Sequence, residues 1–454
     1  MANYNTKNKE TYCPFAWEHQ MIDSDGSYRL CCIADDKITD ENGKPFNVRN
    51  ITLEEVWNSK YMQDARHSML NGEKISDCRP CYKNEEENSY SYRQGTLAKT
   101  LGSHVSFYNP NTTIDPITED DIIVKTAPNY YDFRLGNLCN LKCVMCGPHY
   151  STEHQAEFAK FYNDIDILPE GEKNNELSLV GVNPDTESGK EWISAVEGNE
   201  LYQWAENIKI FDNITNAVNK DSTETIYLTG GEPTIVEGNF KMLKALVNSG
   251  HSKHITVIIN TNCTNLNVNF YKILYEFRGV LLNISIDGIG DTIEYIRYPS
   301  KWKQIDKNLN KIINDINELK LANFRVSFAS VVQMLNAFNL EELIQYYLEL
   351  KTKSNYPDNI TIVPTVLEGP QWYDITNINS WVRKKLNKQL QTYKGKDNSL
   401  DTWLESINKC LTNPEPEHHA LNINTAIAKH TFYKKYRKVD KYNNWFYNII
   451  ERIL

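Results

Sequence analysis

Short apolar runs alternate with helical patterns through the middle of the chain. The runs are rich in β-branched and aromatic residues, which predicts strands at 130–135, 225–229, 255–259, 280–288, 325–333 and 360–364. Between them, apolar residues recur at helical spacing in 239–247, 271–277, 306–319 and 340–350. This regular alternation predicts an α/β fold with a parallel sheet and right-handed crossovers.

A separate unit, 12–93, precedes these repeats. Its residues 21–32 are typical of a hairpin that turns at Asp25-Gly26. Thr52 and Glu55 form a capping box, which predicts the start of an amphipathic helix that ends at Gly72. The predicted inner face of this helix is Leu53, Val56, Trp57, Ala65 and Met69.

The remaining segments are less regular. Residues 94–125 are polar and predict a linker or a wrapping arm, and 151–222 are longer than a crossover needs, so they indicate an insertion. From 376 to 454 the chain is predicted to be helical, at 381–393, 400–411 and 426–454. The basic stretch 434–441 is ordinarily a solvated helix face, and alternatively a docking surface for an acidic reductant protein.

Composition narrows the class of protein. The 454 residues are 40% hydrophobic and include 27 tyrosines, which is a globular composition with room for two or three domains. The net charge of -10 argues against a nucleic-acid binder. No apolar run approaches the roughly 20 residues that span a bilayer, and the polar N-terminus lacks a signal-peptide core, so we expect a cytoplasmic protein. Ten cysteines in that compartment favour metal or redox chemistry.

Three cysteines stand directly after the first predicted strand of the repeats. Cys139, Cys143 and Cys146 have the spacing C-x3-C-x2-C, and Gly147-Pro148 then stops any helix. They are therefore predicted to lie on a loop at a strand end, where α/β folds place their chemistry. A cubane iron–sulfur cluster normally takes four thiolates, so three leave one iron open. The alternative is an apolar stripe on a helix.

A second set of cysteines lies in the N-terminal unit. Cys13, the pair Cys31-Cys32, and Cys78-x2-Cys81 together indicate a four-thiolate site. Zinc and an iron–sulfur cluster both accept four thiolates, so the residues alone leave the metal open.

The three-cysteine loop resembles the cluster loop of the radical S-adenosylmethionine (radical SAM) superfamily. Gly230-Gly231-Glu232-Pro233 follows the second predicted strand and is similar to the family motif that meets the amino group of S-adenosylmethionine (SAM). Met145 departs from the family pattern, which has an aromatic residue before the third cysteine; methionine is flexible enough to replace it. The resemblance implies a partial (β/α)6 TIM-like barrel, a [4Fe-4S] cluster and SAM.

The resemblance also assigns residues at the later strand ends. Asn260, Asn262 and Ser285 are expected there, with Asn260 and Ser285 as SAM-binding candidates. The stretch from Ser285 through Asp287 to Arg297 looks like a family motif in which the arginine pairs with the SAM carboxylate. Arg297 is alternatively a surface residue, and Asp287 is ordinarily a turn former.

The N-terminal unit resembles the twitch module, the short form of the SPASM domain, which carries an auxiliary [4Fe-4S] cluster. By this resemblance Cys13, Cys31, Cys78 and Cys81 are the ligands, with an exchange between Cys31 and Cys32 as an alternative. A structural zinc site is the other alternative. In most relatives the module follows the barrel, whereas here it precedes it.

The expected organisation is therefore a cysteine module (12–93), a linker (94–125), a barrel (126–375) and a helical region (376–454). We expect a radical SAM enzyme that abstracts hydrogen from a peptide or protein, with flavodoxin or ferredoxin as a low-potential reductant. Alternatives are a small-molecule substrate, such as a sugar or nucleotide, and a non-catalytic iron–sulfur scaffold. No catalytic side chain is assigned. The lone thiols Cys263 and Cys410 are expected to be inert packing, with Cys263 kept as a minor candidate because it stands close to the predicted site.

Overall fold

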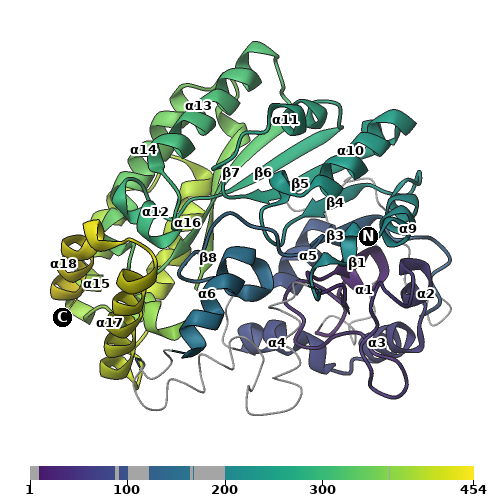
Figure 1. The fold of residues 1–454 in the computed structure, drawn as a ribbon, viewed down its shortest axis with the longest axis horizontal. Helices are drawn as coiled ribbons and strands as arrows, with labels where there is room; N and C mark the ends of the chain where they lie inside the picture. The colour runs from purple at the N-terminus through teal and green to yellow at the C-terminus, as the bar shows by residue number, and fades with distance from the viewer. Residues whose placement is uncertain are drawn as a thin grey trace.

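The computed structural model describes residues 10–86, 91–100, 122–163, 167, 200–367 and 369–453. One eight-stranded sheet runs through it in the order β2-β1-β3-β4-β5-β6-β7-β8 (Figure 1). Its six central barrel strands are β3 (Tyr130–Phe133), β4 (Thr225–Leu228), β5 (Thr256–Thr261), β6 (Gly279–Ser285), β7 (Phe324–Val332) and β8 (Ile360–Val366). All six are parallel, which confirms the predicted α/β fold and its partial barrel.

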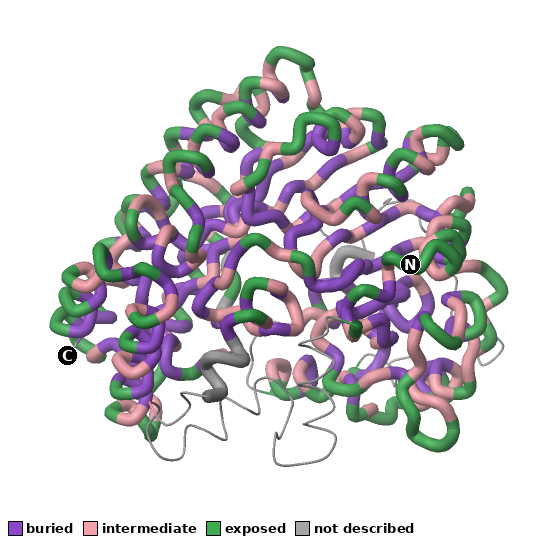
Figure 2. Tube along the Cα trace, in the orientation of Figure 1, coloured by how far each residue is buried: buried purple, intermediate pink, exposed green. Residues whose placement is uncertain are grey.

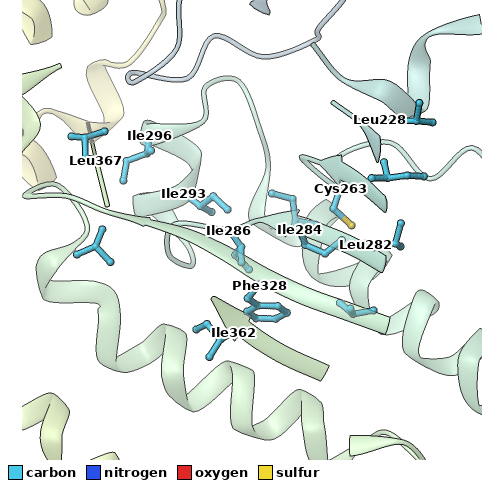
Figure 3. Packing of buried hydrophobic residues seen from close by; sticks show 14 of the residues in the cluster. Leu228, Cys263, Leu282, Ile284, Ile286, Ile293, Ile296, Phe328, Ile362 and Leu367 are labelled. Carbon is cyan, nitrogen blue, oxygen red and sulfur yellow. The ribbon is translucent and has the colours of Figure 1, made fainter. Parts of the chain in front are cut away.

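Helices cover the outer face of these strands. They are α10 (Glu237–Ser249), α11 (Val268–Leu274), α12 (Asp291–Ile296), α13 (Trp302–Glu318) and α14 (Leu340–Thr352). Along β6, Leu282 and Ile284 are fully buried in this outer layer, whereas the alternate residues Asn283 and Ser285 are half-buried (Figure 3). Because side chains alternate across a strand, polar positions of the sheet face the barrel interior.

The N-terminal module shares this sheet. Strand β1 (His19–Ile22), after the short helix α1 (Phe15–Glu18), pairs parallel with β3, and β2 (Tyr28–Arg29) pairs antiparallel with β1. The predicted hairpin and its turn at Asp25-Gly26 are confirmed, with Gly26 at φ +82°. The module is therefore fixed to the barrel through backbone hydrogen bonds.

The single helix predicted after the capping box is instead two helices, α2 (Leu53–Trp57) and α3 (Lys60–Leu70). The break has a tertiary cause. Nε1 of Trp57 donates to the carbonyl of Thr126, and the side chain of Asn58 donates to the carbonyl of Val124. The segment just before β3 therefore fixes the residues at which the two helices meet. The capping box itself and the burial of the predicted inner face are confirmed.

The linker prediction is wrong for 94–100. After α4 (Arg79–Glu86), helix α5 spans Tyr92–Thr100. Ser91 Oγ accepts the amide of Gln94 at its start, and Arg93 pairs with Glu85 on α4. The polar composition gave no sign of this helix, because contacts with α4 stabilise it. The rest of the predicted linker up to 121 lies outside the described residues. The predicted insertion supplies α6 (Thr152–Asn163) and α9 (Ile208–Val218), and most of what lies between them is also outside the described residues.

The C-terminal region contains α15 (Ser380–Leu390), α16 (Asn398–Thr412), α17 (His419–Tyr436) and α18 (Asn443–Ile453). The one helix predicted over 426–454 is thus divided, because Lys438 takes a positive φ of 40° after Arg437 turns inward. Helix α16 lies against β8, and the inner faces of these helices are buried (Figure 2). Among the described helices, none is both long and apolar enough to cross a membrane.

Candidate metal centres and the barrel interior

The three loop cysteines follow β3 in a segment without helix or strand, so the helical-stripe alternative is wrong. Cys143 is buried, and Cys139 and Cys146 are half-buried. Helix α6 supports the loop, because Thr152 Oγ1 accepts the amide of Cys139 at 3.3 Å and donates to its carbonyl at 3.1 Å. The loop therefore presents its sulfurs from a backbone anchored on both sides.

Burial raises the pKa of all three thiols, to about 12 for Cys146. Each side chain also lies close enough to another cysteine or charge to affect its pKa: a charge on Cys143 raises the pKa of both Cys139 and Cys146. Arg297 acts in the opposite direction on Cys143, with Nη1 at 3.9 Å from its sulfur. Thiols that resist ionisation on their own fit a site whose sulfurs become anionic only when they bind iron.

The Gly-Gly-Glu motif lies directly on this loop. A Cβ added to Gly231 would stand 2.1 Å from the carbonyl oxygen of Leu138, the residue before Cys139. The next amide, Glu232 N–H, donates to that same oxygen at 2.8 Å. The sequence predicted that these glycines let a ligand approach, and the structure shows that Gly231 lets the cluster loop itself approach.

The carboxylate of Glu232 is almost fully buried, and its burial raises its pKa. Oε1 accepts hydrogen bonds from the hydroxyls of Thr234 and Thr261 at 2.6 and 2.7 Å, and Oε2 accepts the amide of Asn262 at 2.7 Å. It thus joins the end of β4 to the end of β5. Asn262 in turn donates to the side chain of Asn140 on the cluster loop at 3.0 Å.

A polar row crosses the barrel interior. Asn283 donates to Asn260 at 2.9 Å, and Asn260 donates to the hydroxyl of Tyr227 at 2.5 Å, so three neighbouring strands are connected. Ser285, one pleat further along β6, is half-buried and pairs with Ala329 of β7. The structure therefore brings Asn260 and Ser285 to the carboxyl-terminal half of the inner sheet face, near the cluster loop.

Arg297 is not a surface residue. Its Nε donates to Oδ2 of the fully buried Asp287 at 2.7 Å, and their side chains are 11% and 0% exposed. Asp287 is more than a turn former, because Oδ1 also accepts the amide of Val331 at 2.9 Å. Sequence reasoning undervalued Asp287, although its position after a buried strand was visible.

The second cysteine set surrounds a small cavity in the N-terminal module. Cys13, Cys31, Cys78 and Cys81 all line it. Burial raises the pKa of the Cys31 thiol, and the neighbouring thiols of Cys32, Cys13 and Cys78 raise it further. The amide of Arg93 donates to the sulfur of Cys81 at 3.4 Å. Four thiols around one enclosed space fit an iron–sulfur cluster.

Cys32 is not among the described residues that line this cavity. It lies instead beside Asp132 and Arg134; burial raises the pKa of its thiol, Asp132 raises it further and Arg134 lowers it. Asp132 is 1% exposed, its Oδ1 has no hydrogen-bond partner among the described residues, and burial raises its pKa to about 7. Sequence reasoning missed this residue; a charged side chain within the buried run 130–135 was the available signal.

Two family models match the chain. Residues 133–345 match the radical SAM superfamily, and residues 13–82 match an iron–sulfur cluster-binding domain, the SPASM domain. These segments include all seven candidate cysteine ligands. They imply a [4Fe-4S] cluster with SAM in the barrel and an auxiliary iron–sulfur site in the module, which decides against zinc. They also confirm the unusual order, with the module before the barrel.

No curated protein matches the chain. Among solved structures, Streptococcus suis SuiB bound to S-adenosylmethionine has 12% identity and a TM-score of 0.33, with 78% of this chain covered. The chain spans 65% of that protein's length. SuiB bound to its precursor peptide SuiA has 14% identity and a TM-score of 0.32, with 83% of this chain and 70% of that one covered. These scores are too low to carry an argument about substrate.

Proposed function

Since this chain is a radical SAM enzyme with an auxiliary iron–sulfur module, we propose that it cleaves SAM and abstracts hydrogen from a peptide or protein side chain. Cys139, Cys143 and Cys146 would hold a [4Fe-4S] cluster, which would supply the single electron for cleavage of SAM to methionine and the 5′-deoxyadenosyl radical. The chain's own residues hold the reactants and exclude water. The observation that carries the proposal is that Glu232 binds the three-cysteine loop directly, while β1 joins the module with the second cysteine set to the same sheet.

Several residues are proposed to bind SAM. Glu232 and the backbone of Gly230-Gly231 receive its amino group, because Oε2 of Glu232 retains acceptor capacity beside the cluster loop. Arg297 is positioned for the carboxylate, since a guanidinium offers five donors and Asp287 occupies only part of them. Asn260 and Ser285 face the same interior and are proposed to contact the ribose.

A large substrate is supported by the accessibility of the interior at β8. Val363 pairs with Ala329 and thus shares a row with Ser285 on the inner sheet face, yet it is 40% exposed. An interior that is accessible on this side admits an extended chain. The SPASM module favours a peptide as well, by analogy with its family.

A small polar substrate is the second candidate. The row of Tyr227, Asn260 and Asn283, with the unpartnered Oδ1 of Asp132 nearby, offers hydrogen-bond acceptors and donors of the kind that sugars and nucleotides use. Stimulation of deoxyadenosine formation separates the two classes. Unstructured peptides should raise the rate, whereas a response only to sugars or nucleotides would favour the second candidate.

The reaction itself is tested by anaerobic iron and sulfide analysis, EPR and an assay for 5′-deoxyadenosine. We expect about eight irons per chain, and about four with no deoxyadenosine in the variant Cys139→Ala/Cys143→Ala/Cys146→Ala, since each cubane holds four irons. Cys410→Ala, a buried thiol on α16, is the control and should match the wild type. An absence of deoxyadenosine in the wild type under strong reduction would favour a non-catalytic scaffold.

We also propose flavodoxin or ferredoxin as the electron donor and the cytoplasm as the location, because thiolate clusters and low-potential electrons both require a reducing compartment. Of the basic stretch 434–441, Arg437 is buried and Lys441 pairs with Glu294. The half-buried Lys434 and the exposed Lys438 are proposed as the candidate docking face.

A further inference from the structure

The cluster loop is held by the C-terminal helices as well as by the barrel. Arg437, directly after α17, donates Nη1 to the carbonyl oxygen of Lys142 at 2.8 Å. Lys142 immediately precedes Cys143, so this bond restrains the backbone beside a candidate ligand. The matched radical SAM segment ends at residue 345, and the contact therefore comes from a part of the chain that the family match does not include.

Arg437 is also one half of a buried ion pair. Its Nε donates to both carboxylate oxygens of Glu157 on α6, at 2.8 and 2.9 Å, and Nη2 donates to Oε2 as well. The two side chains are 1% and 5% exposed. Charges removed from water are costly unless they are paired and hydrogen-bonded, so each partner requires the other to stay in place. Figure 1 shows α6 and α17 below the barrel strands, and this ion pair connects α6 to the end of α17.

Helix α6 and the residue before it bind the carbonyls on either side of Lys142. Nε2 of His154 donates to the carbonyl of Cys143 at 2.8 Å, and Ser151 Oγ donates to the carbonyl of Leu141 at 2.6 Å. Burial lowers the pKa of His154 to about 3, so the ring is neutral and contributes a hydrogen bond without a charge. Three consecutive carbonyls, from Leu141 to Cys143, are therefore fixed by α6 and Arg437 together.

Two buried charges lie beside the cluster loop. Arg437 donates to the carbonyl oxygen of Lys142, and Glu157 pairs with Arg437 and lies 3.8 Å from Nζ of Lys142. A reduced cluster carries one more negative charge than an oxidised one. Positive charge near the site therefore raises the reduction potential of a cluster bound there, and negative charge lowers it.

We propose that Arg437 is a positioning residue for the cluster on Cys139, Cys143 and Cys146, which it serves through the Lys142 carbonyl and its charge, with Glu157 as its anchor. This inference rests on the proposed function in that these cysteines hold a [4Fe-4S] cluster. It gives the C-terminal helices a role in the chemistry: they retain the cluster and set its potential.

The test is an EPR-monitored redox titration of the full-length, reconstituted protein, together with the rate of iron loss to a chelator. The signal of the Cys139→Ala/Cys143→Ala/Cys146→Ala variant identifies the auxiliary cluster. Arg437→Gln should lower the potential of the loop cluster, and Glu157→Gln should raise it, because they remove opposite charges. Arg437→Gln should also release iron about 10-fold faster or more, as is typical when an outer-shell partner is lost. Arg437→Lys should keep the wild-type reduction potential of the loop cluster, but it should still lose iron faster than the wild type.

Arg383→Gln is the matched control. Arg383 is a 2% exposed arginine on α15 that donates to the carbonyls of Ile378, Leu411 and Asn413, away from the cluster loop. Arg383→Gln should lower the free energy of unfolding without shifting the reduction potential of the loop cluster. Shifts of equal sign in Arg437→Gln and Glu157→Gln, or no shift in either, would overturn the proposal. If Arg437→Gln does not fold, Glu157→Gln and Arg437→Lys still decide it. A wild type without a loop-cluster signal would instead overturn the proposed function.

Discussion

Replacement of Gly231 by alanine should displace the cluster loop. The added Cβ would lie 2.1 Å from the carbonyl oxygen of Leu138, 2.6 Å from its carbonyl carbon and 2.8 Å from that of Asn137. These are backbone atoms, so no side-chain rotation relieves the overlap. The loop must move away from β4, and Cys139, the next residue, must move with it.

The magnitude follows from two losses. Forcing one extra carbon into a packed site costs about 1–3 kcal/mol. The hydrogen bond from Glu232 N–H to Leu138, 2.8 Å long, is also broken, which costs about 0.5–1.5 kcal/mol. The free energy of unfolding should therefore fall by about 1.5–4.5 kcal/mol, and the reconstituted variant should lose iron from the loop cluster.

Urea unfolding followed by tryptophan fluorescence, with iron analysis of the reconstituted protein, measures both effects. Gly238→Ala on α10 is the control, because its Cβ would meet only the side chains of Leu135 and Phe211, at 3.2 and 3.3 Å. A helical glycine replaced by alanine gains up to about 1 kcal/mol when space allows. Equal unfolding midpoints and iron contents for Gly231→Ala and the wild type would refute the close-approach reasoning.

Two further predictions concern the module and the strand beside it. Cys31→Ala should lose the auxiliary cluster, about four irons per chain, whereas Cys32→Ala should keep it; iron and sulfide analysis distinguishes them, and the reverse result would exchange their roles. Asp132 has a folded-state pKa of about 7, above its ordinary 3.8, so the folded protein holds a proton that the unfolded chain releases. Asp132 should therefore lower the free energy of unfolding of the apoprotein by up to about 4 kcal/mol as the pH rises from 4 to 7, and Asp132→Asn should remove this contribution. Urea unfolding at pH 5 and 8 tests it, and an unchanged pH dependence in the variant would contradict the assignment.

Much of the barrel was predictable because its signals are local. Each of the six strands was predicted within a few residues of its observed bounds, since a buried parallel strand is a short apolar run between turn residues. The C-x3-C-x2-C loop was equally clear, because its spacing and the Gly-Pro stop lie within ten residues. The capping box at Thr52 likewise depends on only four residues.

The incorrect predictions concern segments whose conformation depends on contacts with residues distant in the sequence. The break between α2 and α3 depends on bonds from Trp57 and Asn58 to the segment at 124–126, and helix α5 depends on the pairing of Arg93 with α4. Local propensity carries no information about such partners. For the same reason the sequence did not show that Arg437 is buried. The basic residues around it are typical of a solvated helix face.

The sequence by itself determined the chemistry of this protein: seven cysteines in two sets, a Gly-Gly-Glu motif and six strand-helix repeats identify a radical SAM barrel with an auxiliary module. Only the tertiary structure decided which of Cys31 and Cys32 faces the auxiliary cavity, that β1 joins the module to the barrel sheet, and that Glu157 and Arg437, 280 positions apart, meet beneath the cluster loop. The physical reason is that ligand type and spacing are local properties, whereas charge pairing and cavity shape depend on which surfaces the fold brings together.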